Sequence, residues 1–238
     1  MVRGQARSPA FLIAVCAGGL VAPLGVFAAL FVRAARGTSS GREQDLVESL
    51  YARTRPAHEA MDALLELGRI GGPLLVTVLV LGLLYRGHQR DALFLVAAVA
   101  GAIALALAAK GAVDLLTEGA RGTGDDFPSG HATATTATVA AGVALLGDRL
   151  RLLGAALGAV LVAGYGLALA SLNWHSPSEV VGGWCLGLAW VSSLWLGAAL
   201  VGSGARHVRT PAIGPERTEK PERPGRDTRQ ERRLEPRA

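Results

Sequence analysis

The sequence has few residues of the kinds that form disulfides or bind metals through sulfur. Of its 238 residues only two are cysteines, Cys16 and Cys185, and each lies within an apolar run. Neither a disulfide framework nor a thiolate metal site is therefore expected. Aromatic residues are also scarce, at 5%, yet half of the chain is hydrophobic and its mean hydropathy is +0.35. This composition is too apolar for an ordinary soluble domain, and it favours a protein embedded in a bilayer.

Charge is scarce over long stretches of the chain, and its excess lies almost wholly in the C-terminal tail. The net charge of +5 would suggest a nucleic-acid partner if the basic residues belonged to a folded domain. Residues 204–238 hold ten Lys or Arg and six Asp or Glu, a net charge of +4, which leaves +1 for the rest. The sequence therefore predicts no nucleic-acid partner.

Six apolar runs are long enough, or nearly long enough, to cross a membrane. A secretory signal peptide is the alternative for the first run, but that run exceeds the usual apolar length and lacks a clear small-residue cleavage site. We therefore predict an all-α, polytopic membrane protein built as a six-transmembrane-helix bundle. Frequent Gly and Ala would let these helices approach closely. The predicted spans are approximately residues 10–32, 70–85, 92–116, 131–147, 152–172 and 180–201.

Polar segments divide the chain into a short N-terminus at residues 1–9, a membrane domain at 10–203 and a tail at 204–238. The tail is rich in Pro, Arg and Glu without apolar periodicity, so we predict that it is disordered. Between the first and second spans, residues 34–69 place leucines among charges. This pattern predicts short amphipathic helices at the membrane interface, broken near Pro56. We expect the charges of this region to form a solvated face.

An even number of spans puts both termini on one side of the membrane. Arginines gather in the N-terminus and in the turns at 86–91 and 148–151, whereas the loop after the third span has Arg121. Because positive residues stay cytoplasmic, we predict a multi-pass cell-membrane protein with both termini in the cytoplasm. The arginines of residues 34–69 on the outer side weaken this prediction without reversing it.

Residues 125–131 read Asp-Asp-Phe-Pro-Ser-Gly-His and stand where a polar loop becomes an apolar helix. The first N–H groups of a helix are unpaired and lie at the positive end of its dipole, so they suit an anion such as phosphate. The alternative is a turn that simply caps a helix, with His131 exposed in the first turn. The rest of the chain has to decide between the two.

The parity of the spans brings three positions to the same extracytoplasmic face. Lys110 ends the third span, His131 begins the fourth and His175 follows the fifth. One histidine can attack phosphorus while the other donates a proton to the leaving oxygen. Glu179, four residues after His175, can orient its ring, but residues 176–179 also fit a capping box for the sixth helix. For Lys110, snorkelling to the interface is the alternative to an anion contact.

Residues 128–131 and 175–183 resemble the second and third signature motifs of the type 2 phosphatidic acid phosphatases, or PAP2 proteins. The vanadium haloperoxidases share their phosphate pocket. The resemblance covers roughly residues 70–201 and includes the six-helix layout. It implies that His175 forms a phosphohistidine and that His131 protonates the leaving alcohol. It implies no metal and no other cofactor.

The first and third motifs are degenerate in this chain. The first has an Arg-Pro pair where Thr117 and Glu118 stand, the third has an arginine at Leu169, and its usual aspartate is Glu179. Two phosphate-clamping guanidinium groups are therefore missing, and Arg121 is a candidate substitute. The resemblance assigns the remaining phosphate contacts to Lys110, Ser129 and the Gly130 amide.

Two functions follow from these observations. The first is an integral membrane phosphohydrolase that removes phosphate from a lipid phosphate or a prenyl diphosphate at the outer face. The second, motivated by the missing arginines, is a catalytically weakened relative that binds lipid headgroups or a partner protein without turnover. A transporter is less favoured because the sequence shows no repeat symmetry or broken-helix pattern. A soluble haloperoxidase is disfavoured by the six apolar runs.

Overall fold

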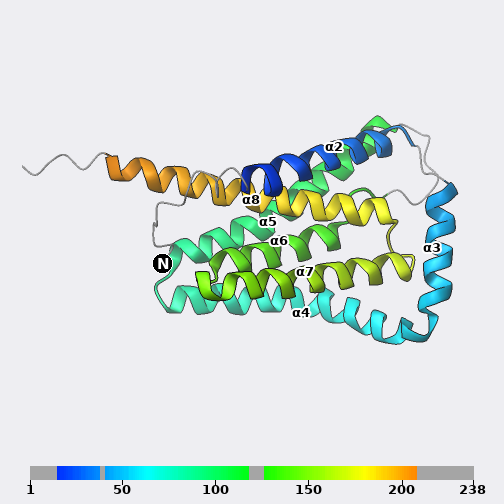
Figure 1. Cartoon of the computed structure of the whole chain (residues 1–238), viewed down its shortest axis with the longest axis horizontal. Helices are drawn as coiled ribbons and strands as arrows, with labels where there is room; N and C mark the ends of the chain where they lie inside the picture. Colours follow the sequence, from blue (N-terminus) through cyan, green and yellow to red (C-terminus); the bar gives the residue numbers. More distant parts are fainter. Residues whose placement is uncertain (1–14, 38–40, 118–125, 208–238) are drawn as a thin grey trace, which may run out of the picture.

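A computed structural model describes residues 15–37, 41–117 and 126–207, in which every regular element is helical (Figure 1). The fold is therefore all-α, as predicted. A seven-residue π-helix leads directly into the first long helix, and a short 3-10 turn separates α3 from α4. The elements are η1 (Val15–Val21), α2 (Ala22–Ala35), α3 (Gly41–Thr54), η2 (Arg55–Ala57), α4 (His58–Tyr85), α5 (Gln89–Leu116), α6 (Gly130–Leu145), α7 (Asp148–Ser171) and α8 (Pro177–His207).

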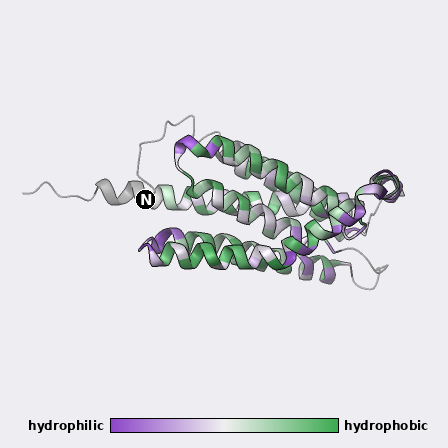
Figure 2. Cartoon of the chain, turned by 90° about the horizontal axis from the view of Figure 1, so that it is seen from below, coloured by the Kyte–Doolittle hydropathy of each residue, from purple (hydrophilic) through white to green (hydrophobic). Residues whose placement is uncertain are grey.

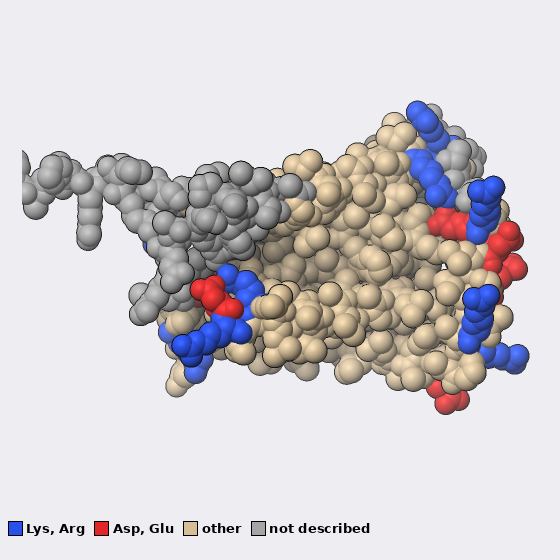
Figure 3. All heavy atoms as spheres, in the orientation of Figure 1, with Lys and Arg blue, Asp and Glu red and all other residues tan. Residues whose placement is uncertain are grey.

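The bundle has the form of a polytopic membrane protein. Five segments are long and apolar enough to cross a bilayer: Gly18–Ala35, a window within Gly41–Tyr85, and the helices α5, α7 and α8. Figure 2 shows hydrophobic residues along the helices and polar residues toward their ends. The visible charged side chains in Figure 3 likewise gather at two opposite ends, with a broad uncharged band between them. This distribution is what the hydrocarbon layer of a membrane requires.

One further apolar helix, α6, has 16 residues and is too short to cross the whole bilayer. It lies among α5, α7 and α8, and it begins at Gly130 directly after the completely buried Ser129. The N-terminus of α6 therefore starts inside the protein rather than at its surface.

Six of the described helices, α2 and α4 to α8, correspond to the six predicted spans, but two boundaries differ. The second span was expected from residue 70, whereas α4 begins at His58 and runs without a break through the charged residues before it. These charges lie at the end of the bundle, where a helix can leave the membrane and remain helical. At the other end of the chain, α8 continues to His207, six residues past the end of the predicted span at 201. The predictions for residues 1–14, 118–125 and 208–238 lie outside the described residues.

Alternate turns of the chain collect at opposite ends of the bundle (Figure 1). The turns after α4 and α6 lie at one end, together with the C-terminal end of α8. The start of α6 and the connection from α7 to α8 lie at the other, which we call the site end. The amphipathic helix α3 crosses the site end at a steep angle to the bundle axis, as both Figure 1 and Figure 2 show. The region predicted to be amphipathic therefore covers the end where the two histidines lie.

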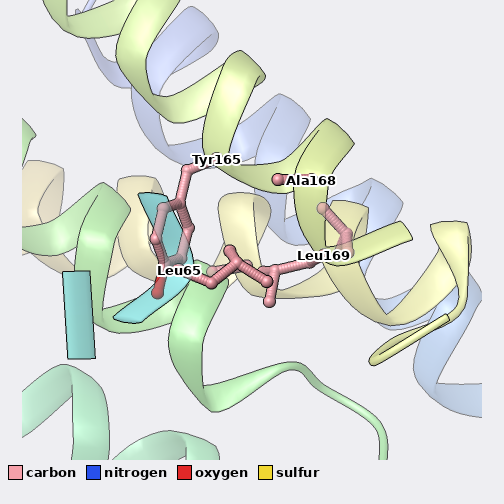
Figure 4. Close-up of a cluster of buried hydrophobic side chains, with 6 residues drawn as sticks. Leu65, Tyr165, Ala168 and Leu169 are labelled. Atoms are coloured by element: carbon pink, nitrogen blue, oxygen red, sulfur yellow. The ribbon is translucent and has the colours of Figure 1, made fainter. Parts of the chain in front are cut away.

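Two apolar clusters hold the bundle together. One lies among α5, α6 and α8 and consists mainly of small residues, so these helices approach closely. The other joins α4 and α7 to the beginnings of α6 and α8, next to the site end (Figure 4). The first cluster contains Leu95, Ala98, Ala102, Ala137, Ala141 and Val191, and the second contains Leu65, Ala132, Tyr165, Ala168, Leu169 and Val180.

The contact between α6 and α8 depends on a glycine on α8. A Cβ added to Gly183 would lie 2.7 Å from the carbonyl oxygen of Ser129 and 3.0 Å from the backbone nitrogen of Thr133. Both atoms belong to the backbone at the start of α6, so a side chain at this position cannot be accommodated by a rotamer change. Gly183 therefore sets the distance between α6 and α8, the helices that begin beside His131 and His175.

We expect Gly183→Ala to lower the free energy of unfolding by about 1–3 kcal/mol because the new methyl group pushes α6 and α8 apart. Gly197 on the same helix is the matched control, since a Cβ there would meet nothing within 4 Å. Gly197→Ala should leave stability unchanged or raise it by up to about 1 kcal/mol. Thermal unfolding of both variants in one detergent measures the difference, and equal melting temperatures would contradict the close contact.

Candidate active site

The C-terminus of α7 determines the position of His175. Asn173 adopts a left-handed conformation with φ 55°, and the N–H of Trp174 donates to the carbonyl of Leu169 at 3.0 Å. The N–H of Asn173 donates to Ala170 at 3.2 Å, which completes a Schellman motif. The His175 N–H donates to the same Leu169 carbonyl at 3.3 Å. The backbone before His175 is thus fixed by hydrogen bonds to the last turn of α7.

Glu179 both contacts the His175 ring and caps α8, the two roles between which the sequence could not decide. Its Oε2 accepts a hydrogen bond from His175 Nδ1 at 2.7 Å, and the same oxygen lies 3.4 Å from the N–H of Ser176. In return, Ser176 Oγ accepts from the Glu179 N–H at 3.4 Å, so the two residues form a capping box at the start of α8. Because Nδ1 donates to the carboxylate, the neutral His175 ring carries its lone pair on Nε2.

The loop before α6 is held from both sides. Phe127 is buried, with ring centroids 5.6 Å from Phe27 and 6.4 Å from Phe31 of α2, and it packs against Gly182 of α8. The N–H of Ser129 donates to the carbonyl of Glu179 at 3.0 Å. The beginning of α6 and the first turn of α8 are therefore joined directly, although 50 residues of sequence separate them.

Ser129 is the N-cap of α6. Its Oγ accepts from the Ala132 N–H at 3.3 Å, which leaves the hydroxyl hydrogen free to be donated. The side chain is completely buried. Gly130 is half-buried, and a Cβ added there would meet nothing within 4 Å, so its backbone borders open space. An incoming anion could thus approach the Gly130 amide more easily than the Ser129 hydroxyl.

The two histidines face each other at the site end. The ring centroids of His131 and His175 lie 6.0 Å apart, and the indole of Trp174 contacts His131 edge-on at 6.2 Å. The His175 side chain is only 9% exposed, and its partner Glu179 is 5% exposed. A single phosphoryl group placed between the rings would be within reach of both.

Lys110 lies on α5 beside this pair. Its Nζ forms an ion pair with Asp126 at 3.4 Å, and its side chain is 25% exposed against 73% for the aspartate. The positive charge of Lys110 also acts on His131. Lys110 is therefore directed toward the protein, in keeping with an anion contact, while Asp126 partly neutralises it.

The PAP2 superfamily model matches residues 92–200. This range extends from α5 into α8 and includes Lys110 and both histidine motifs. Residues 92–200 thus carry the sequence pattern of the PAP2 superfamily. Among solved structures, the chain is similar to a transmembrane PAP2 type phosphatidylglycerolphosphate phosphatase from Bacillus subtilis, with 18% identity and a TM-score of 0.55. The similarity covers 77% of this chain and 96% of that one, so the two share a fold. No curated protein matches the sequence.

Two positions at which the PAP2 motifs carry arginine are occupied by Leu169 and Thr117 in this chain. Leu169 is completely buried and packs with Leu65 of α4 in the second cluster (Figure 4). Thr117 ends α5, and its Oγ1 donates to the Val113 carbonyl at 2.8 Å. The substitute proposed from sequence, Arg121, lies outside the described residues, as does Glu118. Within the described residues, no three His, Cys, Asp or Glu side chains are placed to hold a metal ion.

Glu43 of α3 is part of the site end, and the sequence alone did not indicate this. The expectation of a solvated face is wrong for Glu43, whose side chain is only 13% exposed. One of its oxygens accepts from the Ser178 N–H at 2.8 Å, in the first turn of α8, and the other pairs with Arg33 of α2. Because Ser178 is 135 positions from Glu43 in the sequence, only the fold could have identified this contact. Glu43 thus fastens α3 to the helix that carries Glu179.

The charge of Glu43 should make this attachment dependent on pH. Burial alone would raise the pKa of Glu43, but hydrogen bonds from Ser178 and the charge of Arg33 outweigh it and hold the pKa below the ordinary 4.5. A carboxylate with a lowered pKa stabilises the fold above its ordinary pKa, and this contribution is lost as the pH falls through the lowered value. We therefore expect Glu43→Gln to reduce the melting temperature at neutral pH, and the difference from wild type to shrink in acid. A constant difference from about pH 7 to about pH 3 would contradict this account.

Proposed function

We propose that this protein is an integral membrane phosphohydrolase that removes phosphate from a lipid phosphate or a prenyl diphosphate. The observation that carries the proposal is the His175 ring, fixed by Glu179 at 2.7 Å and facing the His131 ring at 6.0 Å. A nucleophile oriented by a carboxylate, with a second histidine across a gap, is an arrangement suited to phosphoryl transfer. The match of residues 92–200 to the PAP2 superfamily supports the same reaction class.

In the proposed mechanism, His175 Nε2 attacks phosphorus and forms a P–N bond as the P–O bond to the leaving group breaks. His131 donates a proton to the departing oxygen, so that an alcohol or a phosphate monoester leaves. Water then attacks the phosphohistidine, His131 accepts a proton from it, and inorganic phosphate is released. Glu179 stabilises the positive charge that develops on His175 during the first step.

The substrate is proposed to reach the site from the membrane. Both histidines lie at the site end, and the arginine-rich turns at 86–91 and 148–151 connect helices at the opposite end. By the positive-inside rule that opposite end faces the cytoplasm, so the proposed site faces the extracytoplasmic side. A lipid whose headgroup lies at this interface could present its phosphate to the histidines while its chains stay in the bilayer.

A panel of substrates in detergent tests the proposal. Purified protein is incubated with phosphatidic acid, phosphatidylglycerol phosphate and a polyprenyl diphosphate, and released phosphate is measured beside an active lipid phosphatase. Release from at least one substrate is the expected result. No release from any of them, while the reference enzyme hydrolyses them, would reject the proposal.

A second candidate is a weakened PAP2 protein that binds phospholipid headgroups without turnover. It is favoured by the burial of Leu169, which places an apolar side chain where other PAP2 motifs have a guanidinium group. Loss of one donor to a developing negative charge typically costs about 10²–10³ in rate. Saturable phospholipid binding that is unchanged by His175→Ala, with no phosphate release, would support this candidate.

A further inference from the structure

The His131–His175 pair needs positive charge nearby if it is to bind a phosphate, and the motif positions supply little. Lys110 shares its charge with Asp126, and Leu169 is enclosed in an apolar cluster. A dianionic phosphoryl group in a partly buried site requires cationic donors to offset its desolvation. The cation that completes the site should therefore come from an element outside the motifs.

The helix α4 approaches the site closely at residues 65–69. Leu65 is completely buried against the cluster that contains Ala132, the residue after His131. One turn along, a Cβ added to Gly68 would lie 2.4 Å from the ring of Tyr165 on α7, so this ring packs directly on the backbone of α4. Arg69 is four residues after Leu65 and so projects from a similar face of α4. Side chains on a helix lean toward its N-terminus, which for α4 is the site end.

Arg69 lies near enough to the site for its charge to act on the His131 ring, with a smaller effect than those of His175 and Lys110. Its guanidinium group is held in place by Glu66, whose Oε2 accepts from Nε at 3.2 Å and from Nη2 at 2.9 Å. Among the described residues, Nη1 makes no hydrogen bond, and the side chain is 58% exposed. Glu66 thus orients the guanidinium group of Arg69, while Nη1 stays accessible to a ligand.

We propose that Arg69 is a phosphate-binding residue of this site, supplied by α4 rather than by any of the signature motifs. Its free donors contact the phosphoryl oxygens as the group lies between His131 and His175. Glu66 positions the guanidinium group and limits how far it swings toward solvent. This inference rests on the proposed function for its substrate, but the binding of phosphate itself can be measured without turnover.

The test compares Arg69→Ala and Arg69→Lys with Arg53→Ala in the full-length protein. Arg53 is an exposed arginine at the end of α3, so its removal changes the net charge of the site end equally. Binding of inorganic phosphate is measured by titration calorimetry in detergent. We expect Arg69→Ala to weaken phosphate binding about 10-fold or more, Arg69→Lys to weaken it less, and Arg53→Ala to leave it unchanged. Size-exclusion chromatography confirms that each variant is folded.

Phosphate release from the substrate panel provides the second measurement. Arg69→Ala should lower kcat/KM by about 10²–10³ because the guanidinium group stabilises charge on the transferring phosphoryl group. Unchanged phosphate affinity in Arg69→Ala, or a wild type that binds no phosphate, overturns the role of Arg69. If the panel is hydrolysed through His175 and Arg69→Ala retains full activity, the inference fails while the proposed function stands. If phosphate binding depends on Arg69 but no substrate is hydrolysed, the proposed function fails and the inference stands.

Discussion

His175→Ala is expected to lower phosphate release by about 10⁴-fold or more, because it removes the group that forms the covalent intermediate. The loss should appear in kcat, since the remaining residues of the site still bind phosphate. Glu179 would keep its capping bonds to Ser176, so the fold around α8 should survive the substitution. The rate of phosphate release in detergent, with the melting temperature as a check on folding, measures both expectations.

The matched control for this variant is His88→Ala. His88 lies in the turn between α4 and α5 at the opposite end of the bundle, where it pairs with Asp91 at 3.4 Å. Its removal should leave phosphate release unchanged. A direct test of the intermediate is an alkaline detergent quench of wild type after brief exposure to substrate labelled in its phosphoryl group. The label bound to the protein should survive alkali and be released by acid, because a P–N bond is stable in alkali and labile in acid. Activity in His175→Ala close to that of wild type would exclude the proposed nucleophile.

The spanning helices were predictable because a bilayer leaves a simple signature in the sequence. A run of about twenty residues without charge, such as residues 10–32, has few alternatives. Boundaries are less certain where a helix leaves the membrane, as α4 illustrates. Its first turns carry Glu59, Asp62 and Glu66 in an otherwise continuous helix, and the hydropathy pattern alone ends the span before them. Once outside the hydrocarbon layer, a helix needs no apolar composition to continue.

The parts of the site that sequence revealed are those whose geometry is local. Glu179 lies four residues from His175, and at that spacing two side chains meet wherever a turn or helix connects them. Ser176 and Pro177, between these two residues, predict the start of α8. Topological parity then placed His131 at the same end of the bundle. These steps use only short-range rules and the count of membrane crossings.

The parts that sequence did not reveal are contacts between distant elements. Glu43 and Ser178 are 135 positions apart, and nothing in the composition of α3 distinguishes Glu43 from its solvated neighbours. In the sequence, Arg69 likewise looks no different from the other charged residues between 34 and 69, for which a solvated face is expected. Only the packing of Leu65 and Gly68 shows that this turn of α4 lies against the site. Sequence instead suggested Arg121, which is nearer to Lys110 along the chain.

His131→Asn should slow phosphate release from alkyl esters by about 10²–10⁴, the usual contribution of a general acid. The size of the effect should depend on the leaving group. A lipid alcohol is a poor leaving group and needs the proton that His131 supplies, whereas a nitrophenolate leaves readily without one. With p-nitrophenyl phosphate, the first step should therefore proceed at nearly the wild-type rate in the variant.

The second step makes this prediction more specific, because water must then be activated without His131. The phosphohistidine should accumulate in His131→Asn, giving a burst of one nitrophenol per protein followed by slow turnover. Trp174→Phe is the informative comparison, since it alters the edge contact to His131 at 6.2 Å but leaves the acid in place. It should slow all substrates alike and give no burst. An equal loss with alkyl and aryl phosphates in His131→Asn would mean that His131 binds or positions the substrate, and that the proton reaches the leaving oxygen from another group.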